Sequence, residues 1–228
     1  MTTRFIEIFN EFDQIRNEEW SYFVHPIKDV FIKAENAQVL LADLESICQK
    51  QQHRAGSVYF TATVSDDTEI SSAVWAIDFK VDSHPYMAYS VLKMNFRYAW
   101  YIASQANKEK WHRFVEYCID KLKPRHAYSG FEIAQAASLH LSSYDINSLE
   151  KIVAQAFYGM DIDHPSFNRG HDHERTDGYI DYQYLGSGIR TPVWSFLLDP
   201  YWITKLDKTV EEIKAYFNRF KEVEIKEI

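Results

Sequence analysis

The segment VYFTATV (Val58–Val64) decides the fold class, because its side chains alternate between an apolar set and a more polar set. A period of two residues is typical of a β-strand that buries one face. The same period returns in WAIDFKV (Trp75–Val81), after the turn-forming residues Ser65-Asp66-Asp67. The two segments therefore predict a pair of antiparallel strands.

Helical periodicity is found on both sides of this pair. Asn36 is placed to cap a helix that carries Leu40, Leu44 and Cys48 on one face and ends before Gly56. A second helical stripe consists of Trp111, Phe114, Val115, Cys118, Ile119 and Leu122. Because Cys118 lies within that stripe, we expect a buried structural thiol and not a nucleophile.

The remaining segments mix strands and helices without strict β-α-β alternation. The expected elements are strands over 94–103, 126–134 and 180–184, a helix from the capping pair Asn147 and Glu150 to Gly159, a helix after the capping pair Thr209 and Glu212, and a short edge strand over 223–228. This order favours an α+β fold with antiparallel sheet and packed helices, spanning 1–228 as a single domain. An arrangement of two ferredoxin-like halves would also agree with this order of strands and helices.

The composition is that of a soluble globular protein, with 46% hydrophobic and 25% charged residues. The start, MTTRFIEIFNEF, has no unbroken apolar core of the kind that a signal peptide needs, and no later apolar run reaches the length of a membrane span. Cys48 and Cys118 form no CxxC pair. We therefore expect a cytoplasmic protein that does not contact membranes.

The net charge of −8 bears on the partner. Phosphate-backbone attraction, which drives most nucleic-acid affinity, is missing from the chain as a whole, so we expect no direct nucleic-acid binding. A basic partner would instead be attracted to the chain.

One polar segment, FYGMDIDHPSFNRGHDHER (157–175), contains three histidines and four acids. A metal site, a recognition loop and a solvated turn are the three interpretations. His171 and His173 are ligand types that zinc or manganese accepts, but the surrounding Asn168, Arg169 and Gly170 indicate a loop, where nothing fixes their geometry. We therefore predict no bound metal and no cofactor.

As a recognition loop, the same segment has the chemistry to bind a basic partner. Asp163, Asp172 and Glu174 supply negative charge, and Phe167 supplies an aromatic anchor. These four residues are the predicted partner-binding set. A solvated acidic loop that contacts nothing is the competing interpretation.

No catalytic frame is recognisable in the sequence: there is no phosphate-binding glycine loop, no HExxH, no G-x-S-x-G elbow and no kinase motif set. Ser129 and His126 are close in sequence, but on a strand their side chains fall on opposite faces. The sequence therefore predicts a protein that is not an enzyme.

Two motifs in the second half resemble those of a known family. Tyr158-Gly159-Met160-Asp161 is similar to an aromatic-Pro/Gly-Leu-Asp turn, and Gly188-Ile189-Arg190 with Trp194 and Leu198 is similar to a pattern of glycine, basic residue and tryptophan-to-leucine spacing. On these motifs the chain, best over 111–206, resembles the immunity proteins of bacterial type VI secretion, first catalogued as a domain of unknown function.

The resemblance implies a non-catalytic protector that binds and neutralises a cognate toxin effector in the cytoplasm, nucleases being among such toxins. An acidic, aromatic-rich chain is compatible with that role, because its carboxylates can occupy the phosphate sites of a basic toxin. The alternative function is a metal-dependent hydrolase or small-molecule binder that uses the Asp161–Glu174 region.

Overall fold

The computed structural model describes residues 1–28, 30–65, 73–82, 90–124, 126–129, 195–221 and 223–226. The described residues up to Leu122 belong to one compact unit, and those from Lys123 onward belong to a second. That the whole chain folds as a single domain stays a prediction.

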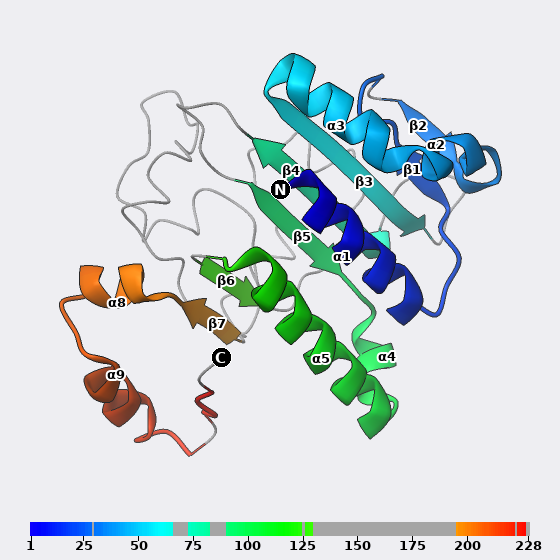
Figure 1. Ribbon diagram of the computed structural model, residues 1–228. Coiled ribbons are helices and arrows are strands. Elements are labelled where there is room, and N and C mark those ends of the chain that lie inside the picture. The colour runs from blue at the N-terminus through cyan, green and yellow to red at the C-terminus, as the bar shows by residue number, and fades with distance from the viewer. Residues whose placement is uncertain are drawn as a thin grey trace, which may run out of the picture. The chain divides into compact units, whose positions relative to one another are not determined.

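A five-stranded antiparallel sheet forms the centre of the first unit. Its strands, in the spatial order β2-β1-β3-β4-β5, are β1 (Tyr22–Val24), β2 (Phe31–Lys33), β3 (Ser57–Ser65), β4 (Ala73–Asp82) and β5 (Val91–Asn95) (Figure 1). In β3 and β4, Phe60 lies opposite Phe79 and Val58 lies opposite Val81. The strand pair predicted from the alternating segments is therefore confirmed.

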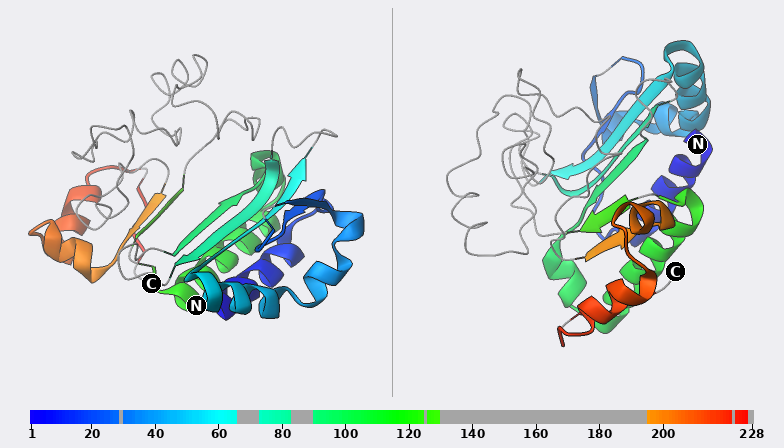
Figure 2. Two further views of the ribbon diagram at one scale, coloured as in Figure 1. Left: turned by 90° about the horizontal axis from the view of Figure 1, so that it is seen from above. Right: turned by 90° about the vertical axis from the view of Figure 1, so that its left-hand side faces the viewer.

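Helices cover one face of this sheet. The helical elements of the unit are α1 (Thr2–Ile15), η1 (Ala34–Asn36), α2 (Gln38–Ala42), α3 (Leu44–Ala55), α4 (Tyr98–Ile102) and α5 (Gln105–Leu122). Helices α1, α3 and α5 all lie on the same side of the strands (Figures 1 and 2). The α+β class with antiparallel sheet is confirmed, although the described elements of this unit do not follow the β-α-β-β-α-β order of a ferredoxin-like half.

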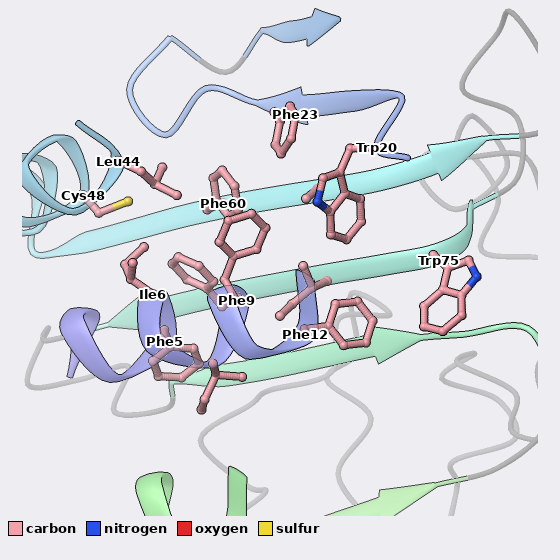
Figure 3. Packing of buried hydrophobic residues seen from close by; sticks show 14 of the residues in the cluster. Phe5, Ile6, Phe9, Phe12, Trp20, Phe23, Leu44, Cys48, Phe60 and Trp75 are labelled. Carbon is pink, nitrogen blue, oxygen red and sulfur yellow. The ribbon is translucent and has the colours of Figure 1, made fainter. Parts of the chain in front are cut away.

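Helix α1 supplies the middle of the hydrophobic core, and it was not predicted from the sequence. Its buried side chains recur at helical spacing: Phe5, Ile6, Ile8, Phe9, Phe12 and Ile15. Phe9 packs against Phe60 of β3, and Phe5 and Phe12 pack against Phe79 and Trp75 of β4 (Figure 3). The fully buried Phe12 lies among the rings of Trp20, Trp75, Trp111 and Phe114, with centroid separations of 5.6 to 6.5 Å.

The helix predicted from Asn36 to Gly56 is interrupted. Asn36 ends the short turn η1, and Asp43 leaves the helical conformation (φ −122°, ψ 19°), so that α2 and α3 are separate helices. Aspartate has a lower helix propensity than the leucine and alanine residues on either side of it, which favours a helix boundary at this position. The predicted end is confirmed, since Gly56 adopts a left-handed conformation with φ 73°.

The strand predicted over 94–103 is wrong beyond Asn95. The chain leaves the sheet there, and 98–102 form α4. The alternating aromatic residues do not line one sheet face. Instead, Trp100 packs edge-on against Trp75 with 5.2 Å between the ring centroids, and the ring centroids of Phe96 and Trp111 are 4.0 Å apart. Packing between aromatic rings therefore determines the structure after Asn95, although the side chains alternate there as they would in a strand.

The second unit pairs β6 (His126–Ser129) with β7 (Ser195–Leu198) in antiparallel register, followed by α8 (Pro200–Lys205) and α9 (Val210–Phe217). The predicted capping box is confirmed: Thr209 accepts a hydrogen bond from the Glu212 amide, and Glu212 accepts one from the Thr209 amide. Trp202 in α8 is buried.

The edge strand predicted at the C-terminal end is wrong for residues 223–226, which have no regular structure. Two other predictions, the helix from Asn147 to Gly159 and the strand over 180–184, lie outside the described residues, as does Trp194.

Replacing Phe12 by alanine tests the role of α1. We expect Phe12→Ala to lower the free energy of unfolding by about 3–5 kcal/mol, because the change leaves a cavity among four aromatic rings. Urea titration followed by tryptophan fluorescence measures the change. The matched control, Phe31→Ala at a site 55% exposed, should cost less than about 1 kcal/mol. Equal losses in the two variants would contradict the assignment of Phe12 to the core.

Candidate functional site

The residues predicted to bind a partner lie outside the described part of the chain. This applies to Asp163, Phe167, Asp172 and Glu174, and equally to His171 and His173. Their roles stay predictions. Among the described residues, no group of three or more histidine, cysteine or acidic side chains could hold a metal ion.

A groove on the helical side of the first unit is the candidate site that the described residues form. It lies between α1 and the α2–α3 segment and has a volume of about 680 Å³. Its apolar wall consists of Ile6, Phe9, Trp20, Leu41 and Leu44, four of which are seen in Figure 3. Its polar lining includes Asn10, Asp13, Arg16, Asp43, Glu45 and Gln49.

One end of the groove is fixed by a hydrogen-bonded cluster around Asp13. Arg16 donates from Nε and Nη2 to Asp13 Oδ1, each at 2.7 Å, and Trp20 Nε1 donates to the same oxygen at 2.5 Å. The Arg16 guanidinium also donates to the Glu18 carbonyl and lies 4.6 Å from the Trp20 ring centroid. Arg16 is therefore held by hydrogen bonds and by a cation–π contact.

The other end carries two exposed acids at the start of α3. Asp43 is the residue before the helix, and its side chain makes no capping hydrogen bond. Glu45 in the first turn accepts a hydrogen bond from Gln49 Nε2 at 3.0 Å. Acids at a helix N-terminus interact favourably with its dipole, so these two residues also stabilise α3.

A second polar cluster connects the loop after α1 to the start of α4. Glu18 Oε1 accepts hydrogen bonds from Trp75 Nε1 at 3.0 Å and from Arg97 Nε at 2.7 Å, and Glu18 Oε2 accepts one from Arg97 Nη2 at 3.3 Å. This arrangement satisfies the N–H of a fully buried indole. Its partners are all engaged with one another, so we assign it a structural role.

Neither cysteine is placed for nucleophilic chemistry. Cys48 and Cys118 are free and buried in the core cluster, as predicted for Cys118. Burial raises the pKa of each thiol to about 12, because an apolar surrounding disfavours the thiolate.

The hydroxyl of Ser129 in β6 lies 2.6 Å from the hydroxyl of Ser195 on the opposite strand, β7.

The groove was not found from the sequence. Its walls come from α1 and from residues about thirty-five positions further on, and only the tertiary fold brings these two segments together. The available signal was the neighbouring apolar pair Ile6 and Phe9, whose helical spacing of three residues predicts part of one wall.

Comparisons with known proteins give a fold and no sequence family. No protein-family model and no curated protein matches the sequence. Among solved structures, the Pseudomonas aeruginosa T6SS protein PA0821, a protein of type VI secretion, is similar, with a TM-score of 0.67 and 13% sequence identity over 93% of this chain. This chain spans 57% of the length of that protein. At such low identity the similarity shows a shared fold.

None of the helices in the described ranges combines the length and the apolar character that crossing a membrane requires.

The buried thiols generate a prediction about labelling and pH. We expect neither cysteine to react with Ellman's reagent at about pH 8 in the folded protein, and both to react in guanidinium chloride. Folding raises the pKa of each thiol from 9.0 to about 12, so the thiols of the unfolded chain ionise at a lower pH than those of the folded protein. The free energy of unfolding should therefore keep its full thiol contribution below pH 9 and fall as the pH rises toward 12. Rapid labelling of the folded protein would contradict the burial of at least one thiol.

Proposed function

We propose that this chain is an immunity protein, which neutralises a cognate type VI secretion toxin by stoichiometric, non-catalytic binding. The observation that carries the proposal is the fold shared with the P. aeruginosa T6SS protein. The motifs at 158–161 and 188–198 support it independently, because they resemble those of type VI immunity proteins.

Charge and shape give the proposal a physical basis. A chain with a net charge of −8 attracts a basic toxin and repels nucleic acid, so it can compete with a nucleic-acid substrate for a nuclease surface. The groove between α1 and α3 adds an acidic, concave surface of the kind that binds a protruding side chain. We place this binding in the cytoplasm.

Co-expression with the product of the neighbouring gene tests the proposal. Cells that make that product alone should stop growing, and cells that also make this chain should grow. The two purified proteins should then elute together in size-exclusion chromatography, with light scattering giving the mass of a stoichiometric complex. Toxicity that this chain does not relieve, with no complex formed, would contradict an immunity role toward that protein.

The hydrolase alternative has its own test. Elemental analysis of the purified protein should find no stoichiometric zinc or manganese, and His171→Ala with His173→Ala should leave protection unchanged. A bound metal that disappears in the double variant would favour the hydrolase instead.

The acidic segment 157–175 provides another test of partner binding. Changing Asp163, Asp172 and Glu174 together to lysine should slow association with the toxin, because charge steering between exposed groups increases the association rate. The effect should shrink as salt rises, since such charges are screened within about 8 Å at physiological ionic strength. Stopped-flow kinetics measures both effects. A triple variant that folds normally and associates at the wild-type rate in low salt would show that these three acids do not contribute to the interface.

A further inference from the structure

We propose that the groove between α1 and the α2–α3 segment receives a lysine or arginine side chain of the partner protein. The inference rests on the proposed function, since the partner is the toxin effector. It goes further by placing a contact on described residues and by stating the chemistry of the group that is bound.

The charges of the groove favour a cation. Asp13 and Arg16 neutralise each other through two 2.7 Å contacts, whereas Asp43 and Glu45 add two negative charges without a cation within ion-pair distance among the described residues. The N-terminus of α3 supplies only about half a positive charge, and the C-terminus of α1 nearby supplies about half a negative one. A net excess of about two negative charges therefore remains.

The arrangement of the aromatic wall determines how a cation would bind. Trp20 is the aromatic residue hydrogen-bonded to Asp13, but the Arg16 guanidinium already lies 4.6 Å from its ring centroid. The carboxylates, and not the indole face, are therefore the groups that bind an incoming charge. Arg16 is itself held by Asp13 and by the Glu18 carbonyl, so it does not leave to make room.

The apolar wall suits the rest of such a side chain. The groove is open to solvent, and its volume of about 680 Å³ is large enough to admit one long side chain. Leu41 at the rim is 37% exposed. The alkyl stem of a lysine or arginine can cover this apolar surface while its charged end reaches Asp43 and Glu45. An acidic peptide or an anionic lipid surface carries the same charge as Asp43 and Glu45 and would be repelled.

The first experiment measures the affinity of the double variant Asp43→Asn, Glu45→Gln for the neighbouring gene product. Both changes keep side-chain size and remove charge, and Asp43 has no capping hydrogen bond to lose. We expect binding to weaken by about tenfold at low salt and by less at high salt. The matched control is Glu35→Gln, Glu109→Gln, which removes the same charge from two exposed positions outside the groove and should leave the affinity within about twofold.

A second experiment does not depend on the identity of the toxin. The peptide acetyl-Leu-Arg-Leu-Arg-amide is titrated into the full-length protein and followed by two-dimensional NMR, with acetyl-Leu-Glu-Leu-Glu-amide as the opposite-charge control. We expect the arginine peptide to shift the backbone amides of Asp43, Glu45 and Gln49 and the Trp20 indole signal. The shifts should disappear in the Asp43→Asn, Glu45→Gln variant, and the glutamate peptide should cause none.

The outcomes separate the two proposals. Toxin binding that the groove variant leaves unchanged overturns the groove while the immunity function stands. A wild-type chain that does not bind the neighbouring gene product contradicts the proposed function for that pair, and the peptide titration then decides the groove alone. Shifts at other residues, or equal shifts with both peptides, overturn the groove as a cation site. A folded two-dimensional NMR spectrum of each variant excludes misfolding as the cause, and a small fall in melting temperature is expected where the acids at the start of α3 are replaced.

Discussion

The contact between α1 and the alternating rows of β3 and β4 is the interaction on which the first unit depends. Six apolar side chains of α1 are buried, and they meet a sheet face in which Phe60, Phe79 and Trp75 are almost completely buried. Neither element can bury these side chains alone, because an amphipathic helix and a one-sided sheet each need a partner. The positions of α3, α5 and the groove follow from this pairing, since α1 packs against both of these helices on the same side of the sheet.

The fold was predictable where the deciding signal is local. The period of two in β3 and β4, the apolar stripe of α5, Gly56 at the end of α3 and the capping box of α9 each depend on residues within one segment, and each is confirmed. The prediction for the segment after Asn95 is wrong, because its aromatic residues alternate as in a strand but pack ring against ring around Trp75 and Trp111. Tertiary packing prevails over local pattern there.

The candidate site could not be predicted in the same way. Its two walls are far apart in sequence, and its charges are ordinary helix-end residues until α1 and α3 face each other. The loop after α1 shows how closely one wall is then held. Arg16 and Trp20 both donate hydrogen bonds to Asp13, and the Arg16 guanidinium also lies over the Trp20 ring. Between them in sequence, Glu18 accepts hydrogen bonds from Trp75 and Arg97. Two buried indole N–H groups are satisfied by carboxylates, so their burial carries no penalty for a missing hydrogen bond. A wall that is held in this way is preorganised for binding.

The two cysteines have a consequence for covalent chemistry. Oxidants attack the thiolate, and with a pKa of about 12 only roughly one thiol in a hundred thousand is ionised at neutral pH. Peroxide or disulfide reagents therefore have little to react with while the protein is folded. Burial therefore slows sulfenic acid formation and crosslinking between chains while the protein is folded.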